Sequence, residues 1–192
     1  MGDPAIETSN ILIVDDDPDI LNALKRTFAD DPYFVLSAEN AAEGMAILGQ
    51  QKIKVVLSDE MMPGMSGAEF LGQVSVRFPT VIRIILTGHA SLDAAIKAIN
   101  MGEIYRFFTK PWNELDLRFS VKAAIEKYNL EEENRRLLKI IRKQVLNMKI
   151  LEEKFPGITR LKYDNTGSII VDDVSDSEIE KILSDLEQKP GQ

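Results

Sequence analysis

The chain has 192 residues, a formal net charge of −8, 44% hydrophobic residues and 28% charged residues. This length holds one full domain and an appendage, and the composition is ordinary for a globular protein. The acidic balance excludes non-specific nucleic-acid binding through a basic surface of the whole chain, and the lack of cysteine excludes disulfides and zinc–thiolate sites. The chain shows no signal-peptide pattern and no apolar run that could span a bilayer, so we expect a cytoplasmic protein without a membrane partner.

Short apolar runs alternate with amphipathic stretches between residues 10 and 125. Strands are expected at 11–15, 33–37, 54–58, 81–86 and 104–108, and helices at 18–30, 41–50, 67–77 and 91–101. Strands that alternate with helices of this length predict βαβ units, and the right-handed crossover rule places helices on both faces of a parallel sheet. The sequence therefore predicts an α/β domain with a doubly wound sheet over 10–125.

The next helix is expected to continue well past this domain, because residues 113–155 contain neither proline nor glycine. Apolar or amide residues recur in alternating steps of four and three at Leu130, Asn134, Leu137, Ile141, Gln144, Met148, Leu151 and Phe155. This heptad seam predicts a coiled-coil extension over 126–155, and the amide of Asn134 at an a position favours a parallel, in-register homodimer through 130–155. Three further apolar residues lie beside the seam, and we expect them to be buried by additional helices or by the tail: Leu138, Ile140 and Val145.

Basic residues on the same helix occupy solvent positions of the heptad. They are Arg135, Arg136, Lys139, Arg142 and Lys143. The acidic residues Glu131, Glu132 and Glu133 balance their charge, and no DNA-reading motif follows. We therefore do not expect contact with DNA.

Residues 156–187 predict a small tail made of a hairpin and one helix. Asp164-Asn165-Thr166-Gly167 is a hairpin turn signal, and Ser175 with Glu178 forms a capping box before a short amphipathic helix. A lone hairpin with one helix is only marginally stable in water. We therefore expect this tail to dock on the long helix or on a partner chain.

Acidic residues follow two of the predicted strands. Asp15 and Asp16 come after the first apolar run, and Asp59 comes after the third, while Asp17 is expected to point elsewhere. Because the carboxyl ends of parallel strands meet at one edge of a sheet, these carboxylates are expected to converge. Clustered carboxylates repel each other unless a cation neutralises them, and an open cage of oxygen ligands suits Mg²⁺.

Two further polar residues follow predicted strands on the same edge. Thr87 comes after the fourth strand and Lys110 after the fifth. A hydroxyl and an ammonium that face a carboxylate–metal cluster can bind the oxygens of a phosphoryl group. Asp59, alone in its loop, is the carboxylate free to act as a nucleophile and form an acyl phosphate, and Gly88 leaves room for the phosphoryl group. The alternative is that these are solvated loop residues without a common site.

These residues together resemble the signature of the receiver domain of two-component response regulators. The matching segments are Asp15-Asp16, Asp59-x-x-Met62-Pro63-x-x-x-Gly67, Thr87-Gly88 and Lys110-Pro111. The resemblance covers residues 10–125 and implies a five-stranded, CheY-like (flavodoxin-like) sheet with strand order 2-1-3-4-5. It also implies that a sensor histidine kinase or a phosphotransfer protein phosphorylates Asp59.

The resemblance further implies roles for single residues. Asp16, Asp59 and the carbonyl of Met61 would bind Mg²⁺, with Asp15 acting through water. The phosphoryl group would be contacted by Thr87 and Lys110. Such a domain assists its own phosphorylation and dephosphorylation but turns over no separate substrate, so we do not expect an enzyme.

The resemblance also implies a switch and two tuning positions. Thr87 would move towards the phosphoryl group and Phe107, at the family's aromatic position, would turn inward. Met61 and His89 occupy places that tune the lifetime of the acyl phosphate. The surface of the predicted helix 91–101, the fifth strand and the long helix would then change and transmit the signal to the coiled coil.

Two alternatives remain open at this point. The chain is a dimeric scaffold or adaptor whose tail recruits a partner, or it is a truncated regulator that lacks its output domain. No catalytic motif is visible in the segment after residue 156.

Overall fold

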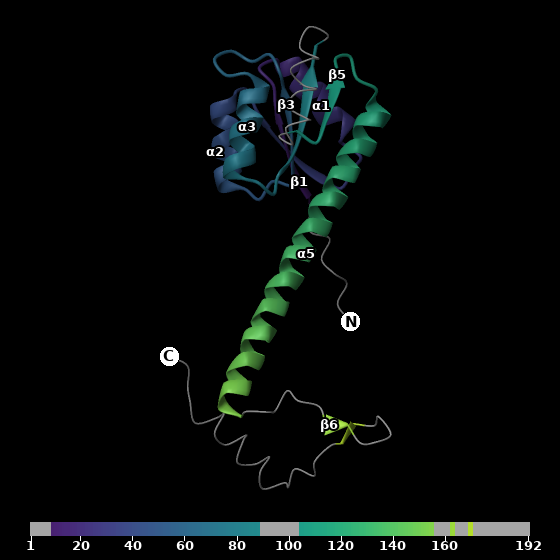
Figure 1. Ribbon diagram of the computed structural model, residues 1–192. Helices are drawn as coiled ribbons and strands as arrows, with labels where there is room; N and C mark the ends of the chain where they lie inside the picture. The colour runs from purple at the N-terminus through teal and green to yellow at the C-terminus, as the bar shows by residue number, and fades with distance from the viewer. Residues whose placement is uncertain (1–8, 89–103, 156–161, 164–168, 171–192) are drawn as a thin grey trace. The chain divides into compact units, whose positions relative to one another are not determined.

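The structure is a computed structural model that describes residues 9–88, 104–155, 162–163 and 169–170 (Figure 1). The chain divides into two units, Met1–Leu137 and Leu138–Gln192. The main sheet belongs to the first unit, and the last helix of that unit continues past Leu137 into the second.

A five-stranded parallel sheet forms the centre of the first unit. Its strands are β1 (Ser9–Val14), β2 (Tyr33–Ala38), β3 (Val55–Asp59), β4 (Ile82–Thr87) and β5 (Arg106–Thr109). The strand order is β2-β1-β3-β4-β5, and every pairing of neighbours is parallel. This confirms the predicted doubly wound, flavodoxin-like sheet.

Helices cover both faces of the sheet. They are α1 (Pro18–Thr27), α2 (Ala41–Gln50), α3 (Gly67–Arg77) and α5 (Glu114–Lys154). Helices α2 and α3 pack on one face, and α1 with the first part of α5 packs on the other (Figure 1). Helix α1 ends before the predicted residue 30 because Phe28 enters the core and the chain turns towards β2. The predicted helix 91–101 lies outside the described residues.

The two faces of the sheet form two separate cores, and β1 shows why its sequence is uniformly apolar. Leu12 and Val14 pack under α2 and α3, whereas Ile11 and Ile13 pack under α1 and α5. Successive side chains of a strand point to opposite faces, so a strand covered on both faces needs an apolar residue at every position. The same reasoning holds for the buried run that ends at Asp59 in β3.

Helix α5 confirms the long helix that the sequence predicts, and its two halves differ in burial. Its buried residues are Leu117, Ser120, Val121, Ala124, Ile125 and Tyr128. Arg118 holds the first half through two hydrogen bonds of 2.9 Å to the carboxylate of Asp31, and the Lys54 ammonium donates to Asn129 Oδ1 at 2.9 Å. After Leu130 the apolar side chains of the helix are mostly exposed.

Beyond α5, two short strands are described. β6 (Lys162–Tyr163) and β7 (Ile169–Ile170) pair antiparallel, on either side of the predicted hairpin turn. The turn itself and the helix predicted after Ser175 lie outside the described residues.

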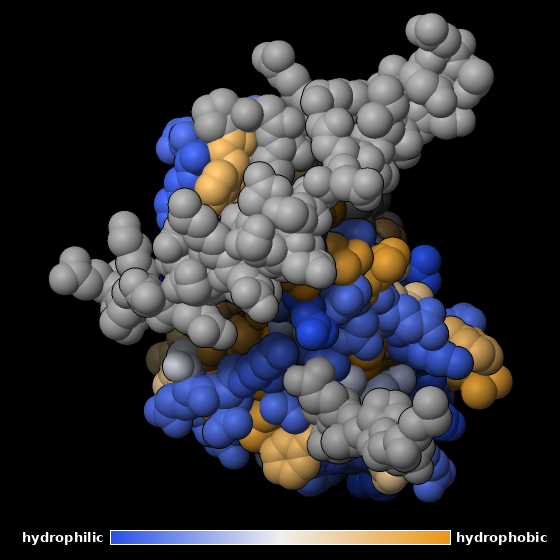
Figure 2. Space-filling view, turned by 90° about the horizontal axis from the view of Figure 1, so that it is seen from below, coloured by the Kyte–Doolittle hydropathy of each residue, from blue (hydrophilic) through white to orange (hydrophobic). Residues whose placement is uncertain are grey.

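On the face shown in Figure 2, the described surface is mostly hydrophilic, with hydrophobic residues scattered in small groups. Among the described helices, none is long and apolar enough to cross a membrane.

Candidate functional site

Three carboxylates meet where β1 and β3 end. Asp15, Asp16 and Asp59 each offer an oxygen that lies within 4.8 Å of the other two. β1 and β3 are adjacent and parallel, with Val14 opposite Ser58, so the carboxyl ends of both strands lie at the same edge of the sheet. Asp15 and Asp59 are buried and Asp16 is exposed, so the cluster opens to solvent on one side.

Lys110 lies between the two buried carboxylates. Its Nζ is 2.8 Å from Asp15 Oδ2 and 2.6 Å from Asp59 Oδ1. Its backbone N–H donates to Thr87 O at 2.8 Å, which fixes the chain after β5 beside the end of β4. Burial on its own lowers the pKa of Lys110, but the hydrogen bonds and charges of the two aspartates outweigh it and raise the pKa above 10.5. The ammonium is therefore charged at neutral pH.

The pKa of Asp15 is raised above 3.8 although the carboxylate is paired with a lysine. Burial is the largest cause, because the side chain is only 1% exposed, and the charge of Asp59 adds to it. Hydrogen bonds from Lys110 and from the Asp17 N–H act in the opposite direction and do not offset the burial. Of the three carboxylates, Asp15 and Asp59 pair with the Lys110 ammonium, and the exposed Asp16 completes a set of hard oxygen donors that fits a divalent cation such as Mg²⁺.

Both carboxylate oxygens of Asp59 have a partner, one of them in the loop that follows β3. Oδ1 pairs with Lys110, and Oδ2 accepts the Met61 N–H at 2.8 Å. Met61 is 71% exposed, and it meets the acidic cluster through its backbone N–H. At Gly67, a Cβ atom would stand 2.0 Å from Asp59 O, so only glycine lets α3 begin this close to the end of β3.

Thr87 and Phe107 lie on the neighbouring strands β4 and β5. Thr87 is fully buried and pairs with Thr109, and its hydroxyl donates to Gly88 O at 3.0 Å. Within the described residues, the hydrogen bond of this hydroxyl thus goes to the Gly88 carbonyl and not to the three acids. Phe107 is half-buried and packs against the core under α2 and α3. His89 lies outside the described residues.

Sequence reasoning missed one buried acid that adjoins this site. Glu60 follows Asp59 directly and is only 6% exposed, and its Oε2 accepts the Ala68 N–H at 3.1 Å. Burial is the largest cause that raises the pKa of Glu60 above 4.5, with smaller contributions from Asp59 and Glu69, while the Ala68 N–H lowers it. The sequence does contain a signal for the burial of Glu60, namely its position between a buried strand and the start of a helix.

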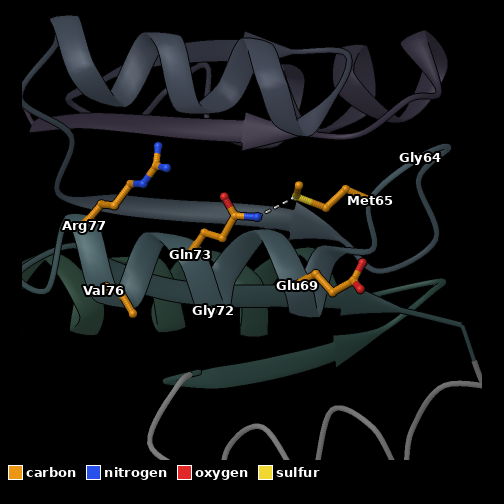
Figure 3. A pocket seen from close by; sticks show the side chains of 7 residues that line it. All are labelled: Gly64, Met65, Glu69, Gly72, Gln73, Val76 and Arg77. Atoms are coloured by element: carbon orange, nitrogen blue, oxygen red, sulfur yellow. Dashed lines mark hydrogen bonds between the residues drawn. The ribbon is translucent and has the colours of Figure 1, made fainter.

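A separate hollow of about 660 Å³ lies along α3 (Figure 3). Met65 and Gln73 meet over it, where the Gln73 amide donates to Met65 Sδ at 3.5 Å. Gly72 lines it, and the space beside this glycine is open, since a Cβ there would meet nothing within 4 Å. None of the residues that line it belongs to the acidic cluster, so the hollow is not part of that site.

Comparison with known proteins places this geometry in a family. The family described as "Response regulator receiver domain" matches residues 11–122. The chain belongs to the response regulator receiver family. Solved receiver domains have the same fold: one from Clostridium thermocellum is 35% identical with a TM-score of 0.61, covering 64% of this chain and 98% of that one. The signal receiver domain of an HD domain-containing protein from Pseudomonas fluorescens Pf-5 is 32% identical with a TM-score of 0.64, covering 69% of this chain and 97% of that one.

Curated relatives of this receiver chain are longer proteins. The hydrogenase transcriptional regulatory protein HoxA of Cupriavidus necator is 36% identical over 129 residues, which are 67% of this chain and 27% of HoxA. The DNA-binding transcriptional regulator NtrC of Escherichia coli K12 is 34% identical over 125 residues, which are 65% of this chain and 26% of NtrC. The matched receiver region thus spans about a quarter of the length of these relatives.

Proposed function

We propose that this chain is a response regulator of a two-component phosphorelay that accepts a phosphoryl group on Asp59 from a sensor histidine kinase or a phosphotransfer protein. The observation that supports this most strongly is the meeting of Asp15, Asp59 and Lys110 within hydrogen-bonding distance at one edge of the sheet. In this proposal Asp16, Asp59 and the Met61 carbonyl hold Mg²⁺, and Asp15 acts through water. The protein acts in the cytoplasm.

The chemistry is a direct transfer to a carboxylate. An oxygen of Asp59 attacks the phosphorus and forms a C–O–P bond, while the P–N bond to the donor histidine breaks and the imidazole leaves. Bound Mg²⁺ supplies positive charge to the phosphoryl oxygens. Lys110, already fixed beside Asp59, stabilises the same developing negative charge. The domain assists this transfer and the later hydrolysis but turns over no separate substrate.

The same site accounts for a conformational switch. The Thr87 hydroxyl, which donates to Gly88 O in this structure, turns to the phosphoryl group, and Phe107 on the adjacent strand fills the space that it leaves. The surface of the predicted helix 91–101, β5 and α5 then changes. Because α5 continues without interruption to Lys154, a change in its packing reaches the heptad seam.

The second part of the proposal is a parallel homodimer through 130–155, with the receiver at 10–125, the coiled coil at 126–155 and the tail at 156–187. Ile141 is 52% exposed within a run of exposed apolar residues, which a partner helix would cover. In a parallel, in-register pair the seam amides Asn134 and Gln144 each meet their own copy, and Ile140 at a g position meets Val145 at an e position of the second chain. In this arrangement polar seam residues pair with polar ones and apolar flanks with apolar ones.

Phosphorylation tests the first part of the proposal. The full chain incubated with acetyl phosphate and Mg²⁺ is expected to gain one PO₃ group, seen by intact mass spectrometry, and chelation of Mg²⁺ by EDTA is expected to reduce the labelled fraction to background. The label is expected to be released by hydroxylamine, which cleaves acyl phosphates. Labelling that persists in EDTA or resists hydroxylamine would contradict a metal-dependent aspartyl phosphate.

Oligomeric state tests the second part. Ile141→Lys places a charge at an a position and is expected to convert the dimer to a monomer, measured by light scattering coupled to size-exclusion chromatography. Leu146→Lys is the matched control, because Leu146 is 58% exposed but falls on the outer f position. A monomeric parent chain, or equal dissociation by both substitutions, would refute the seam.

One alternative has a specific observation in its favour. The names of HoxA and NtrC describe transcriptional regulators, and the match spans about a quarter of each. This favours a reading in which the receiver and α5 are the regulatory part of a longer regulator. The dimeric adaptor remains the other alternative, and a partner whose binding ignores Asp59→Asn would support it.

A further inference from the structure

We propose that Glu60 is a positioning residue that fixes the turn Asp59–Met61 by tying it to the N-terminus of α3. The inference rests on the proposed function, because this turn contains two of the proposed Mg²⁺ ligands. Neither the resemblance to receiver domains nor the signature residues assign a role to this acid.

Glu60 joins three elements through both its backbone and its side chain. Its N–H donates to Leu86 O of β4 at 2.9 Å, and its carbonyl accepts the Gly67 N–H at 2.9 Å. Its carboxylate Oε2 accepts the Ala68 N–H at 3.1 Å. One residue therefore links the end of β3 to β4 and to the first turn of α3.

These bonds explain why an acid is buried here. The first N–H groups of a helix have no partner within the helix, and its N-terminus carries a partial positive charge. Glu60 satisfies two of these groups in α3, while the Glu69 N–H bonds to Ser66 Oγ. A buried carboxylate is costly unless it is hydrogen-bonded, and this helix end supplies the donor and the charge.

The link determines how firmly Met61 is held. The Met61 N–H donates to Asp59 Oδ2, and Met61 itself is 71% exposed. Met62, which follows Met61, is buried and anchors the chain after the turn. Before Met61 the anchor is Glu60. Without its carboxylate the Asp59–Met61 peptide units gain freedom, and a metal ion that binds there must restore their order at a cost in affinity.

The experiment compares three variants of the full chain. Glu60→Ala removes the side-chain acceptor, and Glu60→Gln keeps an oxygen that can accept the Ala68 N–H. Glu69→Ala is the matched control, because it removes a bond to the Ser66 N–H at the same helix end and leaves the hydrogen bonds of Glu60 and Met61 in place. The readouts are Mg²⁺ affinity by calorimetry and, in metal-free protein, hydrogen exchange of the Met61 amide.

We expect Glu60→Ala to weaken Mg²⁺ binding by about tenfold or more, as is typical for residues that orient metal ligands. We also expect it to speed exchange of the Met61 amide. Glu60→Gln should stay close to the parent chain in both, and Glu69→Ala should leave both unchanged.

The inference is overturned if Met61 exchange in Glu60→Ala equals that of the parent chain, or if Glu69→Ala has the same effect on it. It is also overturned if the parent chain binds Mg²⁺ and Glu60→Ala binds it equally well. A parent chain that binds no Mg²⁺ instead refutes the proposed metal site, while the exchange result still decides the role of Glu60.

Discussion

Asp59→Asn is expected to abolish phosphoryl transfer to this chain while leaving the fold intact. The amide of asparagine is not a nucleophile, and the neighbouring Asp15 is only 1% exposed and already bonded to Lys110 and the Asp17 N–H. The substitution removes one of three mutually repelling carboxylates, and Lys110 keeps Asp15 as its partner at 2.8 Å. Without Mg²⁺, the free energy of unfolding should therefore stay the same or rise.

The measurement is intact mass after incubation with acetyl phosphate and Mg²⁺, together with thermal unfolding with and without Mg²⁺. Mg²⁺ should raise the unfolding temperature of the parent chain and have a smaller effect on Asp59→Asn, since ligand binding to the folded state stabilises it. Asp17→Asn is the matched control: Asp17 caps α1 by accepting the Asp19 N–H, and asparagine caps helices equally well. Labelling that survives in Asp59→Asn, or disappears in Asp17→Asn, would show that the acceptor is misassigned.

Features with local causes could be read from the sequence. The bounds predicted for α2 and α3 are those observed, because side chains mark where each helix begins: Asn40 accepts the Glu43 N–H, and Ser66 and Glu69 form a capping box. The edge at which Asp15, Asp16 and Asp59 meet follows from parallel pairing of two buried strands, and the alternation of strands and helices indicates that pairing.

Features with distant causes could not be read from the sequence. Ile104 is apolar and buried but precedes β5, because burial alone does not place a residue in the sheet ladder. Lys54 looks like a solvated residue, yet it is buried because Asn129 and the Tyr128 ring, far along the chain, receive its ammonium. The direct pairing of Lys110 with two carboxylates depends on how three strand ends meet, which no local pattern encodes.

Gly67→Ala is expected to have the largest effect on stability of any single methyl added to the described part of α3. The new Cβ would lie 2.0 Å from Asp59 O, 2.8 Å from Asp59 C and 2.9 Å from Glu60 Cα. All three are backbone atoms, so no side chain can move aside, and either β3 or the start of α3 must shift. We expect the free energy of unfolding to fall by about 3 kcal/mol or more, the upper end for overpacking, measured by urea denaturation.

Gly72→Ala, in the same helix, is expected to have the opposite effect on the free energy of unfolding. A Cβ at Gly72 meets nothing within 4 Å, so the substitution brings only the higher helix propensity of alanine and should raise the free energy of unfolding by up to about 1 kcal/mol. Because the displaced atoms at Gly67 belong to Asp59 and Glu60, Gly67→Ala should also reduce acetyl phosphate labelling under conditions where the variant is folded, whereas Gly72→Ala should label like the parent chain. If the two alanine variants were equally stable, the close approach of α3 to the end of β3 would be wrong, and with it the geometry assigned to the Asp59 loop.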